Sequence, residues 1–252
     1  MLIKAGEIIK NSWEVYAKNW RRLFPYMLLI FLPNFLLGPV GFASMYLDKF
    51  APGGFFMYLN NFVVLAIFAA SIIFALWAAA AMTKNLKALS ENQAGFNWRE
   101  ALVTTSRFIW PIIYTSILVM LVVLGGTILL IIPGVIFSIW FVFSYYTVIF
   151  EDKKGREALK ASRALVAGRW WGILWRLIVP GIFFGLLAAI LSYAVATGLG
   201  YIFQASMLFA LTNAFFTSII SSLVAPLSAL ATLLLYLNAK KEPAASLLTP
   251  EK

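Results

Sequence analysis

Long apolar runs recur along this chain with a single charged residue, Arg176, among them, and they constrain its fold more than any other feature. They occupy about 23–47, 58–82, 112–132, 135–150, 171–198 and 207–237. Most contain about twenty residues or more, which is enough for an α-helix to cross a bilayer core of about 30 Å. Only 12% of the residues are charged, about half of the usual share in a soluble domain. The sequence therefore predicts an all-α integral membrane protein with six transmembrane helices.

Several of these runs contain signals for breaks or turns. Pro33 and Pro39 interrupt the first run and predict a kink. The polar residues 83–97 predict a loop, and Pro133-Gly134 predicts a tight turn between the third and fourth runs. The fourth run would form about 24 Å of helix, so the hairpin of residues 112–150 either crosses the bilayer fully or enters it only in part.

The last two runs differ from the others in length and in packing signals. The run 207–237 is too long for one perpendicular span, so it requires either tilt or a separate outer helix before Thr217. In the fifth run, Gly181 and Gly185 form a GxxxG pattern. This pattern predicts a face on which another helix packs closely.

Three charged segments each precede a pair of apolar runs. Residues 3–21 and 156–168 show apolar and charged side chains on opposite helical faces, and Asn97 is suited to cap a short helix between them. The three segments align as Glu7–Ser12, Glu100–Thr105 and Glu157–Ser162. We expect three cytoplasmic amphipathic interfacial helices and a three-fold tandem repeat of parallel units. The units would span about 1–82, 97–150 and 155–240 of a single transmembrane domain, followed by a disordered cytoplasmic tail, 241–252.

The basic residues predict the orientation of the chain. Five of the twenty Lys and Arg residues lie in the first 22 residues, four in 83–107, seven in 151–176 and three in 240–252, which leaves only Lys49. The positive-inside rule therefore predicts a multi-pass cell-membrane protein with both termini in the cytoplasm. The first twenty residues alternate charged and apolar groups, unlike a cleavable signal peptide. The chain has a net charge of +10, and its basic residues flank the apolar runs. This arrangement favours anionic lipid over nucleic acid as the partner.

The residues available for chemistry are few. The chain has no Cys and no His, which removes the commonest metal ligands and general base. The apolar runs contain no Asp, Glu or Lys, although ion-coupled transport usually needs such groups within the membrane. Glu151 and Asp152 are expected at a hydrated helix start. We therefore expect no catalytic residues, no metal site and no cofactor, and a protein that is not an enzyme.

The strongest candidate site is a basic stretch that follows the fourth apolar run. We expect five cations there to bind phospholipid headgroups at the cytoplasmic face: Arg156, Lys160, Arg163, Arg169 and Arg176. An equally weighted interpretation is that they only determine topology. A second candidate is the hydroxyl cluster Thr217, Ser218, Ser221 and Ser222. It would either line a route for a solute or make interhelical hydrogen bonds, and we favour the latter.

One stretch also resembles a known family. Ile132-Pro133-Gly134, an aromatic span, Glu151, Glu157-Ala-Leu-Lys-Ala-Ser162 and Gly168-Arg-Trp-Trp171 resemble the membrane domain found beside glycerophosphoryl diester phosphodiesterases. The resemblance covers residues 130–185 and transfers no catalytic residue, because the phosphodiesterase domain is absent. It implies a membrane module that binds phospholipid, anchors a membrane or peripheral protein partner, or does both. The alternative is a passive transporter or channel for a small or lipid-like solute.

Overall fold

The computed structural model describes residues 2–50, 55–93, 97–203 and 207–242, and within these ranges it contains helices and turns but no strand. The elements are α1 (Ala5–Phe50), α2 (Phe55–Ser90), α3 (Trp98–Thr105), the 3-10 helix η1 (Ser106–Phe108), α4 (Ile109–Leu129), α5 (Ile131–Trp140), α6 (Ser144–Glu151), α7 (Arg156–Val166), α8 (Trp170–Phe203) and α9 (Met207–Lys241).

Six helical segments of the described chain are long and apolar enough to span a membrane. They are Ala5–Gly41, Met57–Ser90, Trp98–Leu129, Ile131–Glu151, Trp170–Phe203 and Met207–Lys241. This finding confirms the all-α class and the number of candidate spans, and it fits a multi-pass membrane protein. The longest helix, α1, has 46 residues and would measure about 69 Å. It must therefore extend well beyond a hydrocarbon core.

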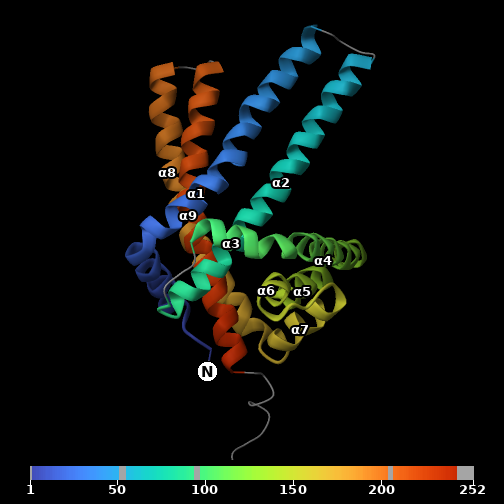
Figure 1. Cartoon of the computed structure of the whole chain (residues 1–252), viewed down its shortest axis with the longest axis vertical. Helices are drawn as coiled ribbons and strands as arrows, with labels where there is room; N and C mark the ends of the chain where they lie inside the picture. The colour runs from blue at the N-terminus through green and yellow to red at the C-terminus, as the bar shows by residue number, and fades with distance from the viewer. Residues whose placement is uncertain (1, 51–54, 94–96, 204–206, 243–252) are drawn as a thin grey trace, which may run out of the picture.

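The helices form two long hairpins and one short compact group (Figure 1). The hairpin of α1 and α2 and the hairpin of α8 and α9 both extend toward the top of the view and diverge there. In contrast, α4 runs across the view, with α5, α6 and α7 gathered beneath it. Helix α1 packs against α2 and α9, and α8 packs against α9. The hairpin of residues 112–150 therefore points in a different direction from the other two, and both of its predicted alternatives, full and partial crossing, stay predictions.

The core lies where the lower ends of the helices meet. Its largest fully buried side chains include Tyr26 of α1, Leu86 of α2, Phe143 beside α6, and Leu230 and Tyr236 of α9. Toward the other end, α2 and α8 leave large apolar side chains exposed. Apolar surface of this extent is expected on helices that contact lipid.

Helix α1 is continuous, so the predicted interfacial helix 3–21 and the first span are parts of one element. Pro25, Pro33 and Pro39 lie within it. Each proline removes one backbone hydrogen bond and favours bending rather than termination when packing supports both sides. Figure 1 shows α1 changing direction between its dark blue first part and its lighter second part.

The predicted loop at 83–97 is wrong for its first eight residues, because α2 continues to Ser90. Leu86 and Leu89 are buried there, so packing extends the helix through a stretch that is polar on its other side. The predicted cap of the next helix is confirmed, because the Asn97 side chain accepts a hydrogen bond from the Arg99 backbone N–H at 3.2 Å.

The turn predicted at Pro133-Gly134 is also misplaced. The chain reverses at Leu130, which is extended, and Pro133 lies in the first turn of α5, where its missing N–H costs no hydrogen bond. Gly134 faces Thr127 so closely that a Cβ would collide with it. The fourth span is broken between α5 and α6, at residues 141–143, which the uninterrupted apolar run concealed.

Three smaller expectations about the last two spans also change. No heavy atom outside the local backbone lies within 4 Å of a Cβ built on Gly181 or Gly185, so no described segment packs on this GxxxG face. Helix α9 is unbroken from Met207 to Lys241, so there is no separate outer helix before Thr217. Lys241, assigned to the tail, is helical, whereas residues 243–252 lie outside the described residues.

Candidate functional site

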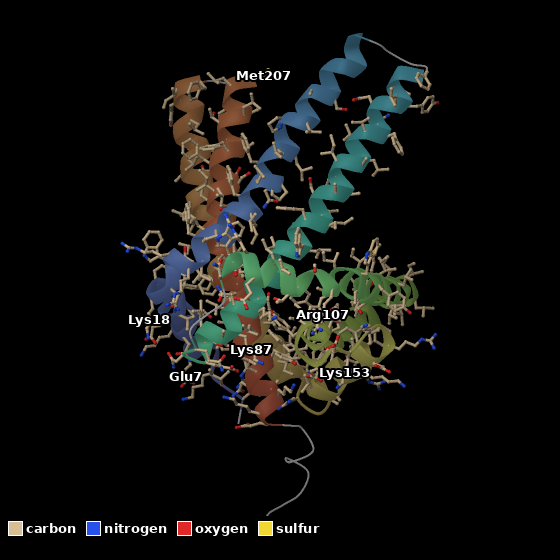
Figure 2. The ribbon with its side chains drawn as sticks, viewed as in Figure 1. Glu7, Lys18, Lys87, Arg107, Lys153 and Met207 are labelled. Carbon is tan, nitrogen blue, oxygen red and sulfur yellow. The ribbon has the colours of Figure 1, made fainter. Side chains whose placement is uncertain are left out.

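Charged side chains gather at the end of the molecule that holds the core. Figure 2 places Glu7, Lys18, Lys87, Arg107 and Lys153 in the lower half, and Met207 at the opposite end. This separation of charge from apolar surface agrees with the pattern read from the sequence. The candidate site lies within the charged half.

The start of α7 is positioned by a glycine that no other residue could replace without strain. Gly155 has φ of +51°, and its N–H donates to Oγ1 of Thr115 at 2.9 Å. A Cβ at this position would collide with the ring of Tyr114. The close approach fixes α7 against α4.

Ser162 then ties α7 to the break between α5 and α6. Its hydroxyl accepts from the Phe143 N–H at 3.0 Å and donates to the Trp140 carbonyl at 2.7 Å. Breaks of this kind leave backbone groups without helical partners. One buried hydroxyl therefore satisfies both sides of the interruption and holds α7 in place.

Three of the five predicted site residues share one exposed face. Arg156, Lys160 and Arg163 are exposed on α7, while Ala158, Ser162 and Val166 on the opposite side are buried. The Arg163 guanidinium lies over the Trp140 ring, 4.3 Å from its centroid, a cation–π contact that orients the side chain toward α5.

Arg169 does not belong to that face. Its side chain is only 8% exposed and donates to the carbonyl oxygens of Leu165, Ala239 and Glu242. Burial lowers the pKa of its guanidinium, and the carboxylate of Glu242 opposes this effect. Because the last carbonyls of a helix lack helical partners, Arg169 caps the end of α9.

Arg176 holds the beginning of the chain. It donates to the carbonyl of Gly172 at 2.8 Å, of Ile3 at 2.5 Å and of Leu2 at 3.1 Å. The Ile3 N–H in turn donates to the side-chain oxygen of Asn238 at 2.9 Å. Arg169, directly before α8, thus holds the end of α9, and Arg176 in α8 holds residues 2 and 3. These two arginines bind backbone carbonyls, whereas Arg156, Lys160 and Arg163 are exposed on α7.

A groove runs between α5, α7 and α8 and ends at the exposed basic face. Its volume is about 620 Å³, within the range of about 300–1,000 Å³ typical of small-molecule sites. Its lining is Ile131, Ile132, Val135, Ile136, Trp140, Arg163, Ala167, Gly168, Trp170 and Trp171. Arg163 is the single cation among these residues. An apolar groove with one cation at its rim suits an amphiphile with an anionic end.

The sequence did not reveal this groove, because its walls come from three separate elements. One local signal was available in the sequence, because Trp170 and Trp171 are adjacent aromatic residues at the start of an apolar run. Their rings meet edge to face with centroids 4.8 Å apart, and both line the groove.

The Glu151 carboxylate contacts protein side chains, whereas the sequence predicted a hydrated position for it. Its Oε1 accepts from the Tyr236 hydroxyl at 2.7 Å and lies 3.1 Å from Lys240 Nζ. Its Oε2 lies 2.7 Å from Lys153 Nζ. These three donors satisfy the carboxylate and join α6 to α9. Asp152, in contrast, is exposed, 3.9 Å from Arg107.

The hydroxyls of the last span bond their own helix instead of a neighbour. Thr217 donates to the Asn213 carbonyl at 2.6 Å, Ser218 to Ala214 at 2.7 Å and Ser222 to Ile219 at 2.8 Å. The favoured expectation of interhelical hydrogen bonds is therefore wrong for these three residues.

Neither a metal site nor similarity to a known protein helps to identify what the groove binds. The described residues contain no group of three or more His, Cys, Asp or Glu side chains that could hold a metal ion. In comparisons with known proteins, no family model, curated protein or solved structure matches this chain. The interpretation of the site therefore depends on its own geometry.

Proposed function

We propose that this protein is a non-enzymatic multi-pass module of the cell membrane that binds phospholipid in the groove between α5, α7 and α8. The observation that carries the proposal is the apolar lining of the groove with Arg163 at its rim. The acyl chain would lie along Ile132 and Ile136, and the phosphate would reach Arg163. A planar guanidinium can donate two parallel hydrogen bonds to a phosphate.

The surroundings of the groove support a position at the cytoplasmic interface. Arg156 and Lys160 extend the positive charge of Arg163 along the exposed side of α7. Trp171 is 68% exposed, as expected of an aromatic anchor at headgroup level. With the charged end in the cytoplasm, both termini lie there.

The burial pattern supports the three-fold repeat as part of the same proposal. In Glu7–Ser12, Glu100–Thr105 and Glu157–Ser162, the Glu is exposed, while the following residue and the final hydroxyl residue are fully buried. Equal burial at equal positions is expected of units that present the same face to one core. The groove belongs to the third unit.

Lipid binding is favoured over a solute route along α9. A route that donates hydrogen bonds to a solute would need free hydroxyl protons, and the hydroxyls of Thr217, Ser218 and Ser222 already donate theirs to carbonyls of their own helix. The passive-transport alternative consequently has less support than the groove.

The test is native mass spectrometry of gently extracted protein, comparing Arg163→Gln with Arg156→Gln. Both changes remove one exposed charge from α7, but only Arg163 lines the groove. We expect Arg163→Gln to reduce co-purified anionic phospholipid roughly fivefold and Arg156→Gln to change it by less than about twofold, because a nearby cation contributes about 1 kcal/mol. Ile136→Trp should displace lipid while leaving the basic face intact.

Equal retention of phospholipid by all three variants would overturn the assignment of the groove. A lipid-free wild-type spectrum with a second polypeptide attached would instead favour a module that anchors a partner, the other role implied by the resemblance. Lipid-free protein alone would shift the weight to transport.

A further inference from the structure

A second hollow, unlike the groove, is polar and lies between α1 and the end of α2. Its volume is about 720 Å³. Its lining is Ala17, Lys18, Asn19, Trp20, Arg21, Arg22, Leu89, Asn92 and Gln93. The cations are contributed by α1, whereas the opposite wall comes from Leu89 near the end of α2 and from Asn92 and Gln93 just after it. No residue of the groove takes part, so the two sites are independent.

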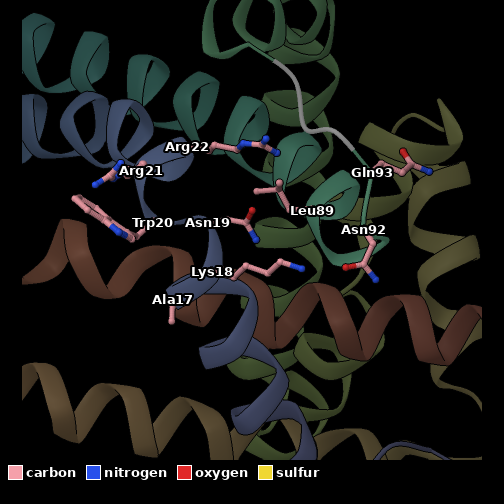
Figure 3. Close-up of a pocket in the computed structure, with 9 residues that line it drawn as sticks. All are labelled: Ala17, Lys18, Asn19, Trp20, Arg21, Arg22, Leu89, Asn92 and Gln93. Carbon is pink, nitrogen blue, oxygen red and sulfur yellow. The ribbon is translucent and has the colours of Figure 1, made fainter.

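The side chains of the hollow divide into two groups (Figure 3). Lys18, Asn19 and Arg22 extend from α1 toward the end of α2, where Asn92 faces them. Lys18 and Arg22 are four residues apart and therefore lie on the same face of the helix. Arg21 turns to the other side, beside Trp20, with its guanidinium 5.7 Å from the ring centroid.

The two inward cations have no acidic partner among the described residues, because no carboxylate of these residues lies within 4.0 Å of Lys18 or Arg22. Glu91 adjoins Asn92 in the sequence, but its carboxylate accepts a hydrogen bond from the Gln93 amide at 3.4 Å. Like charges four residues apart on a helix repel each other by a few tenths of a kcal/mol. The attraction of both cations to a bound anion would offset this repulsion.

The hollow also offers neutral donors. The Asn19 amide uses one N–H on the Val15 carbonyl at 2.9 Å and keeps a second. The Asn92 side chain makes no hydrogen bond to the described residues, and its backbone φ is +57°, a conformation that Asn and Gly tolerate best. Leu89, only 4% exposed, closes the floor of the hollow.

We propose that this hollow binds the dianionic phosphate of a phosphomonoester. Two cations match its two charges, and the amides of Asn19 and Asn92 supply further donors. The volume exceeds that of one phosphate, and the polar lining suits a headgroup or a soluble phosphate ester rather than an acyl chain. Both sources share the phosphomonoester group. A monoanionic diester would satisfy only one of the two charges.

The experiment titrates the full chain, reconstituted in phosphatidylcholine nanodiscs, with dihexanoyl phosphatidic acid, dihexanoyl phosphatidylglycerol and glycerol 3-phosphate. We expect phosphatidic acid to bind at least about tenfold more tightly than phosphatidylglycerol. Lys18→Gln/Arg22→Gln should weaken that binding roughly 25-fold, since each cation contributes a factor of about five. The matched double variant Lys4→Gln/Lys10→Gln removes equal charge from exposed residues that do not line the hollow, and it should change that binding by less than about twofold. Asn92→Gly keeps the backbone and should weaken binding severalfold.

The measurement is made in the Ile136→Trp background, so that the groove does not contribute. Tight binding of phosphatidic acid without binding of glycerol 3-phosphate assigns the hollow to a lipid headgroup, and binding of both assigns it to the phosphomonoester itself. Equal loss in the two double variants, or no preference for the phosphomonoester, would overturn the proposal.

Discussion

Replacing Ser162 by Ala should destabilise the protein through the backbone that this hydroxyl serves. Ser162 is fully buried. Its hydroxyl accepts from the Phe143 N–H and donates to the Trp140 carbonyl, at 3.0 and 2.7 Å. Alanine fits the same space, so the change deletes two hydrogen bonds without creating a large cavity. The N–H of Phe143, also fully buried, would lose this partner.

The size of the effect follows from those two bonds. A typical intramolecular hydrogen bond contributes about 1 kcal/mol, and a buried donor left without a partner costs about 1–3 kcal/mol. We therefore expect Ser162→Ala to lower the free energy of unfolding by about 2–3 kcal/mol. For a chain of this size, this corresponds to a decrease in Tm of roughly 5–10 °C. The orientation of α7 should loosen as well, and with it the position of Arg163.

The assay is thermal unfolding of detergent-solubilised protein, followed by tryptophan fluorescence. Ser138→Ala is the matched control, because Ser138 is exposed and donates only to the Val135 carbonyl of its own helix, at 2.8 Å. That change should stay within about 0.5 kcal/mol. If the two variants unfold at the same temperature, Ser162 does not hold the break between α5 and α6, and the reasoning is refuted.

Two further predictions concern the cap that Arg169 forms on α9 and the orientation of the protein in the membrane. Arg169→Lys should lower the free energy of unfolding by about 1–2 kcal/mol, because one ammonium cannot reproduce the planar set of hydrogen bonds to α7 and α9. The control is Arg21→Lys at an exposed position, which should leave the free energy of unfolding almost unchanged. Equal effects of the two changes in thermal unfolding would contradict the capping role of Arg169. Because the chain lacks cysteine, single substitutions can report sidedness. A membrane-impermeant maleimide should modify Lys49→Cys in intact cells but Lys154→Cys only after lysis; the reverse result would overturn the orientation.

Composition and spacing were sufficient for the class of protein and for the distribution of charge. Apolar runs of about twenty residues and basic residues confined between them are local properties of the chain, and transfer into lipid depends on them almost directly. The cap at Asn97 was equally local, since its side chain bonds a backbone group only two residues away. Such features are readable without knowing any tertiary contact.

Helix ends and breaks depended on packing as well as on local preference. Pro133 and Gly134 have the composition of a turn, yet they lie in the first helical turns of α5, where proline is tolerated. The break at residues 141–143 carries no Pro or Gly. It exists because a serine from α7, about twenty residues later, satisfies the backbone there.

The roles of the basic residues were decided by tertiary structure alone. Arg163 and Arg169 are six residues apart and chemically identical, yet one lies at the rim of a groove and the other caps a helix that ends about seventy residues later. The polar hollow likewise joins Lys18 to Asn92. The charge pattern determines which segments stay outside the lipid, because the cost of moving a segment from water into lipid depends on its composition. Which cation faces a ligand is decided by the carbonyls and rings that folding brings beside it.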